Sequence, residues 1–130
     1  MRRNPLMAIW LFVLLAPMSA RAHHAFASVF DGEKPITLTG PVTKIEWANP
    51  HVHLNIDVKD ETGTVINWAI ELGSPNVVIR RGWTRHAMKI GDVVTIEGHL
   101  ARDGSKLANA RTVLLAGKKM FVGPSDGSGR

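Results

Sequence analysis

Two histidines alternate with apolar residues near the middle of the chain. The run from His51 to Val58 alternates polar and apolar side chains, which is the period-two pattern of a strand with one buried face. Its polar side carries His51, His53, Asn55 and Asp57. Histidines two apart on one face of a strand are separated by about 6.5 to 7 Å, so both imidazoles can turn toward one ion.

A second histidine pair, His23 and His24, follows an apparent export signal. If cleavage leaves His23 at the amino terminus, its α-amine and imidazole can chelate the same ion, and nitrogen ligands of this kind suit Cu(II), Ni(II) or Zn(II). The chain contains no cysteine, so thiolate ligands are excluded. We therefore predict a copper or zinc site built from His23, His24, His51 and His53.

The next strand of the pattern supplies a carboxylate. Residues 64–72 place apolar side chains on one side and Asn67 and Glu71 on the other. A hairpin closed around residues 59–63 predicts that His51 faces Glu71, His53 faces Ala69 and Asn55 faces Asn67. Glu71 is thus an auxiliary or indirect metal partner, and a slip of two residues would change these partners without changing the faces.

A different class of function uses the same polar face without a metal. Tryptophans that end structural elements can line a cleft, and together with side-chain amides they suit protein or glycan recognition. The alternative is therefore an interaction module whose ligand face comprises Trp47, Asn49, Asn55 and Asn67. Arg80, Arg81, Arg85 and His86 form a basic cluster that is expected to be a solvated face, with anionic sugars or lipid headgroups as its other possible ligands.

Catalysis has no support in the sequence. The serines lie in turn contexts without a nucleophile elbow, and no glycine-rich phosphate loop or paired carboxylate motif is present. We predict that the protein is not an enzyme.

The first 22 residues predict export. Met1-Arg2-Arg3, an apolar run from Leu6 to Leu15 and the small-x-small site Ala20-Arg21-Ala22 are typical of a cleavable signal peptide. The apolar run is too short for a stable membrane span, so we expect a periplasmic protein. Three of the 16 basic residues lie in this segment, leaving 13 against 11 acidic ones, and from this near balance we expect no nucleic-acid partner.

The order of elements predicts the fold. A long first strand over 36–47, bent at Gly40-Pro41, is followed by two strands, a helix that starts at Ser74-Pro75, and strands at 93–100 and 108–115. This order is that of a five-stranded, partly open Greek-key barrel of the OB type, all-β with one short helix. A plain antiparallel sandwich is the alternative. The expected organisation is a signal peptide at 1–22, an N-terminal arm at 23–35, a barrel at 36–122 and a flexible tail at 123–130.

Three stretches carry a resemblance to a known family. They are Ala22-His23-His24-x-Phe26, the run from Leu38 to Trp47 followed by Asn49-Pro50-His51, and the run from Gly91 to Gly98. Together they resemble a family of small exported bacterial proteins classed as a domain of unknown function. The resemblance covers essentially the whole mature chain. It implies a periplasmic domain with a signal peptide and assigns no activity.

Overall fold

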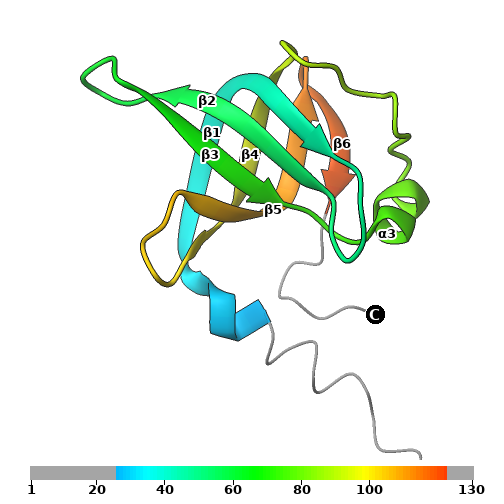
Figure 1. Cartoon of the computed structure of the whole chain (residues 1–130), viewed down its shortest axis with the longest axis horizontal. Helices are drawn as coiled ribbons and strands as arrows, with labels where there is room; N and C mark the ends of the chain where they lie inside the picture. Colours follow the sequence, from blue (N-terminus) through cyan, green and yellow to red (C-terminus); the bar gives the residue numbers. More distant parts are fainter. Residues whose placement is uncertain (1–25, 123–130) are drawn as a thin grey trace, which may run out of the picture.

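A computed structural model describes residues 26–122, which form one strongly curled sheet (Figure 1). The strand order is β3-β2-β1-β4-β5-β6, and a short parallel pairing of β3 with β5 partly closes the sheet into a barrel. The strands are β1 (Phe30–Glu46), β2 (His53–Lys59), β3 (Val65–Glu71), β4 (Val93–Ala101), β5 (Leu107–Leu115) and β6 (Lys118–Val122), and the helix α3 spans Pro75–Arg80. The predicted OB-like barrel with a helix between the third and fourth strands is confirmed.

The first strand is long because it pairs with two other strands, β4 and β2, along different parts of its length. Its first part pairs with β4 and its last part with β2, and the register shifts between Val42 and Lys44. This irregularity follows the Gly40-Pro41 step, where the sequence predicts a bend. Gly40 is required there, because a Cβ at this position would overlap the carbonyl group of Asp57. The strand begins at Phe30 rather than at Ile36.

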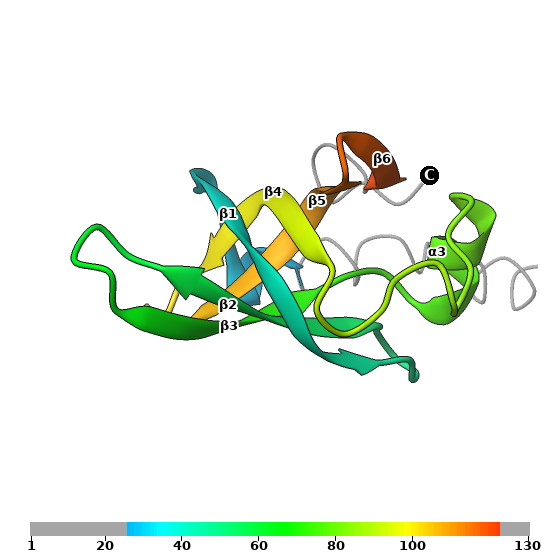
Figure 2. The same ribbon diagram turned by 90° about the horizontal axis from the view of Figure 1, so that it is seen from above.

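The core fills the barrel from the alternating inner faces of the strands. Every predicted inward residue of the second strand from Val52 to Ile56 is fully buried, as are Ile70 and Leu72 on the third. α3 and the loop after it add Val78, Trp83 and Met88 to the same core cluster. α3 therefore lies at one end of the barrel (Figure 2), and its cap is the predicted one, because Ser74 accepts a hydrogen bond from the backbone N–H of Val77.

The sixth strand was not predicted. β6 pairs with β5 through a turn at Ala116 and Gly117, both of which have positive φ angles. Alanine rarely adopts that conformation, so Ala-Gly is a weak hairpin signal in a sequence. Lys118 and Lys119 at the start of the strand are typical of a sheet edge.

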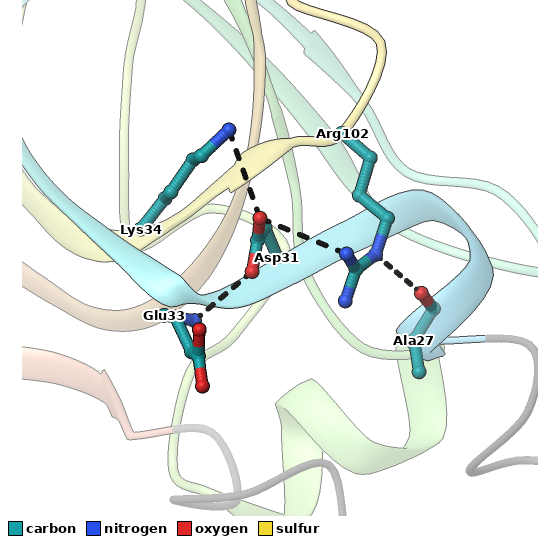
Figure 3. Close-up of polar contacts among 5 residues, drawn as sticks. All are labelled: Ala27, Asp31, Glu33, Lys34 and Arg102. Atoms are coloured by element: carbon teal, nitrogen blue, oxygen red, sulfur yellow. Dashed lines mark hydrogen bonds and ion pairs between the residues drawn. The ribbon is translucent and has the colours of Figure 1, made fainter.

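The beginning of the described chain is attached to the turn after β4. Residues 26–29 form a helical turn, and the Phe26 ring lies 5.4 Å from that of Phe30. Arg102 donates a hydrogen bond from Nε to the Ala27 carbonyl at 2.6 Å and lies 3.7 Å from the Asp31 carboxylate (Figure 3). Its backbone N–H also donates to the Val29 carbonyl. These contacts fix the direction in which the chain enters β1.

Candidate functional site on the outer face of β2 and β3

The outer face comprises the polar side of the second and third strands. Its members are His51, His53, Asn55, Asp57, Asn67 and Glu71. In the observed register His53 lies opposite Glu71, Asn55 opposite Ala69 and Asp57 opposite Asn67. The predicted pairing is therefore wrong by two residues, although the two faces are assigned correctly.

The turn between the strands explains this register. The Asp60 carboxylate accepts hydrogen bonds from the backbone N–H groups of Thr62 and Thr64, at 2.8 and 2.9 Å, and from the Thr62 hydroxyl at 2.7 Å. These bonds draw Thr64 into the turn, so the first ladder pair of β3 is Val65 with Lys59. The hydrogen bond from the Thr62 hydroxyl is the main reason that the pKa of Asp60 is lowered, and the backbone donors add to it.

Glu71 contacts both histidines of the outer face. Its Oε1 lies 3.4 Å from Nδ1 of His51, and its Oε2 lies 3.7 Å from Nε2 of His53. The two imidazole rings are 6.4 Å apart and nearly perpendicular. The side chains of His51 and His53 are 43% and 35% exposed, and that of Glu71 is 21% exposed. Two solvent-accessible imidazoles therefore flank one half-buried carboxylate.

A row of polar residues continues from this group across the barrel. Glu46 on β1 pairs with His53 on β2, and His53 pairs with Glu71 on β3. Glu71 pairs in turn with Asn109 on β5, and Asn109 pairs with His99 on β4. The Phe26 ring packs edge-to-face with the His99 ring, and the two ring centroids are 6.3 Å apart. Sequence reasoning missed His99 and Asn109, because only the closure of β3 on β5 brings them beside Glu71. The sole local signal was the alternation of His99 with apolar neighbours on its strand.

The side-chain amides of Asn55 and Asn67 form a hydrogen-bond network on the outer face. Asn67 accepts a hydrogen bond from Asn55 at 2.9 Å and donates to Asp57 at 2.7 Å and to Thr43 at 3.1 Å. Asn55 and Asn67 thus contact each other as predicted, diagonally rather than as direct partners. The network joins three strands and holds the polar side chains in one arrangement.

The predicted metal ligands are only partly within the described chain. His51 and His53 lie together as expected, whereas His23 and His24 fall outside the described residues. Imidazole nitrogens beside a carboxylate are a donor set that suits zinc and copper. Among residues 26–122, however, no group of three His, Asp or Glu side chains is placed to hold a metal ion.

The tryptophans and Asn49 divide between core and surface. Trp68 and Trp83 are buried, with Lys106 lying 5.1 Å from the centre of the Trp68 ring, so both belong to the packing of the barrel. Trp47 is half-buried against the core and Asn49 is exposed beside it. All four residues proposed for a ligand face retain accessible surface, since Trp47 and Asn55 are half-buried and Asn49 and Asn67 are exposed.

The chain belongs to a family of unknown function, DUF6152, whose model matches residues 12–110. No curated protein matches the sequence. The structure of Rim1, a mitochondrial single-stranded DNA-binding protein from S. cerevisiae, is similar over 64% of this chain and 93% of that one, with a TM-score of 0.51 and 10% identity. The N-terminal domain of PriB from Thermoanaerobacter tencongensis matches 66% of this chain and 99% of its own, with a TM-score of 0.46 and 16% identity.

The expectation that nucleic acid is excluded as a partner has to be corrected. It rested on the near balance of charge in the predicted mature chain, yet a single-stranded DNA-binding protein has this fold. The net charge of a protein does not decide whether it binds nucleic acid when its positive charges are concentrated on one part of its surface. At 10% identity the likeness to Rim1 shows the fold alone, so it removes the exclusion without assigning a ligand.

Within residues 26–122 there is no helix of the length and hydropathy needed to cross a membrane.

Proposed function

We propose that this protein is a periplasmic, non-catalytic binding module that holds Cu(II) or Zn(II) through His51 and His53 together with His23 and His24. The observation that supports this most directly is the contact of both strand histidines with Glu71, at 3.4 and 3.7 Å. A carboxylate between two accessible imidazoles can orient their nitrogens and favours a bound cation.

The position of Phe26 supports a contribution from the N-terminal pair. Phe26 lies against His99, and His99 is two ladder steps from Glu71. Two such steps between neighbouring strands correspond to a distance of about 10 Å. Two or three extended residues, at about 3.5 Å per residue, can span most of this distance. His23 and His24 precede Phe26 by that number of residues. Because the outer face supplies only two imidazoles, these two residues are the proposed remaining ligands.

Export is part of this proposal and has its own test. The motif at Ala20-Arg21-Ala22 supports cleavage that leaves His23 first. Mass spectrometry of the exported protein should give a chain that starts at His23. A mature form that retains Arg21 would remove the α-amine of His23 from the ligand set.

Metal titration of the processed protein tests the site itself. Replacing His51 and His53 together with alanine should weaken Cu(II) or Zn(II) binding at least a hundredfold, because two of the four proposed imidazole ligands are lost. Both side chains project from the barrel, so the double variant should fold normally by circular dichroism. His86→Ala is the matched control, since His86 is exposed on the loop after α3. Unchanged affinity in the double variant would exclude the proposed site.

The role of Glu71 can be separated by substitution. Metal binding requires neutral imidazoles, so affinity should fall as the solution is made more acidic. If Glu71 only orients the two histidines, Glu71→Gln should change metal affinity little, because glutamine keeps a side-chain oxygen at the same position. If Glu71 is itself a ligand, the same substitution should lower affinity at every pH.

A second candidate is recognition of a protein or glycan by the outer face without a metal. The hydrogen-bonded amides of Asn55 and Asn67, next to half-buried Trp47, favour it. It predicts that partner binding survives chelation of metal and is lost on Trp47→Ala. Because Rim1 is a single-stranded DNA-binding protein, a single-stranded oligonucleotide belongs among the ligands tested.

A further inference from the structure

A concentrated positive surface lies away from the outer face. The segment from Ser74 to Ile90 contains Arg80, Arg81, Arg85 and Lys89 and no Asp or Glu. All four cationic side chains are exposed, as is His86 between them. None of the salt bridges found among residues 26–122 involves them. We call this segment the basic knob.

The basic knob is anchored firmly to the barrel. Val78, Trp83 and Met88 alternate with its cations and are buried in the core, with Trp83 only 1% exposed. The backbone N–H of Trp83 also donates a hydrogen bond to the Val78 carbonyl, which ties the loop back to α3. The buried anchors turn the polar side chains outward, so the positive charges are presented on a fixed support.

An apolar side chain accompanies these charges. Ile79 is 53% exposed, and it shares the exposed side of α3 with Asn76 and Arg80. A large aliphatic side chain in water beside guanidinium groups is unfavourable in the isolated domain. It becomes favourable where an anionic layer covers an apolar one.

We propose that the basic knob docks this protein on a membrane surface that carries anionic phospholipid headgroups. Arginine guanidinium groups match phosphate geometry and bind it through paired hydrogen bonds. Each basic residue held near an anionic bilayer strengthens attachment severalfold. Ile79 inserts at the boundary between the headgroups and the acyl chains, beside the phosphates that Arg80 binds.

Single-stranded nucleic acid fits the same charges less well. Such binding relies on bases stacking on exposed aromatic rings between the cations. The one aromatic residue of the segment among Phe, Trp and Tyr is Trp83, and its ring is buried in the core. The knob therefore offers an aliphatic side chain where a nucleic-acid site would present a ring.

Vesicle flotation with the protein purified after export tests the proposal. Phosphatidylcholine vesicles that contain phosphatidylglycerol should bind the protein, and pure phosphatidylcholine vesicles should not. The triple variant Arg80→Gln, Arg81→Gln, Arg85→Gln should bind roughly a hundredfold more weakly. Ile79→Ser should bind several-fold more weakly with an unchanged salt dependence, because it removes apolar contact and no charge.

The matched control removes three exposed cations elsewhere, in Lys59→Gln, Lys118→Gln, Lys119→Gln. It should bind nearly as well as the wild type. Equal vesicle binding by the two triple variants would overturn the proposal, as would failure of the wild type to bind phosphatidylglycerol vesicles. Oligonucleotide binding that only the arginine variant loses, without vesicle binding by the wild type, would reassign the knob to nucleic acid. Thermal unfolding checks that each variant is folded.

Discussion

The outer face of β2 and β3 and the basic knob use polar side chains in opposite ways. On the outer face, Glu71 contacts two histidines and Asn67 makes hydrogen bonds to three other side chains. On the knob, the arginines form no ion pair within residues 26–122. The polar groups of the outer face already contact one another, so the proposed ligand would have to displace some of these contacts. The arginines of the knob have no ion-pair partner within residues 26–122 that would have to be displaced.

This difference follows from how each region is supported. Side chains on the outer face are neighbours because three strands are in register, so each residue depends on its cross-strand partners. Cations of the knob are displayed from one short continuous segment, and repulsion between like charges keeps them apart. We therefore expect the outer face to be sensitive to changes in the barrel, and the knob to respond mainly to changes in its own charges.

The largest effect should come from Gly40→Ala, which breaks the support of the outer face. The added Cβ would overlap the Asp57 carbonyl, and β1 would have to move away from β2. We expect a loss of about 3 to 5 kcal/mol in the free energy of unfolding, as for severe backbone or packing conflicts. Urea denaturation measures it. Gly32→Ala is the control, because a Cβ there meets nothing within 4 Å, and equal stability of the two variants would contradict the close approach of the strands.

A smaller effect is expected from Asn67→Ala, which removes the centre of the amide network. Three side-chain hydrogen bonds are lost on an exposed face, so the variant should lose about 1 kcal/mol. Asn76→Ala provides the comparison with the knob. Asn76 is exposed on α3 and has no side-chain hydrogen bond among the described residues, and alanine favours a helix. If both substitutions changed the unfolding midpoint equally, the contrast between the two regions would not hold.

The smallest effect concerns the turn that sets the register of the outer face. Hydrogen bonds from Thr62 and its neighbours lower the pKa of Asp60, so the folded state favours the charged carboxylate. This contribution is present above the ordinary aspartate pKa of about 3.9 and is lost as the pH falls through the lower folded value. Asp60→Asn should therefore unfold at a slightly lower temperature near pH 7, and this difference should disappear toward about pH 2.

Thermal unfolding across that range provides the measurement for Asp60, with Glu61→Gln as the control. Glu61 lies in the same turn and has no hydrogen bond or ion pair within residues 26–122. A difference between wild type and Asp60→Asn that stayed constant with pH would mean that the carboxylate charge has no role in the turn.

The sequence by itself determined the features that depend on neighbouring residues. Alternation over His51–Val58 assigned the buried and polar faces correctly, because successive side chains of a strand point to opposite sides. The Ser74 cap and the position of α3 were equally local, since they depend on hydrogen bonds within a few residues. The element order then predicted the barrel, because three strands, a helix and two further strands in this order are typical of an OB barrel.

Only the tertiary structure decided which residues of different strands meet. The register of β2 with β3 depends on the hydrogen bonds of Asp60, and alternation is unchanged by a two-residue slip. The neighbourhood of Glu71, Asn109 and His99 exists because β3 pairs with β5, a long-range contact with no local pattern. The arginines of the knob have no ion-pair partner within residues 26–122, because the barrel places its carboxylates elsewhere. Spatial proximity across a closed sheet is set by packing and register, which a linear pattern of residue types does not encode.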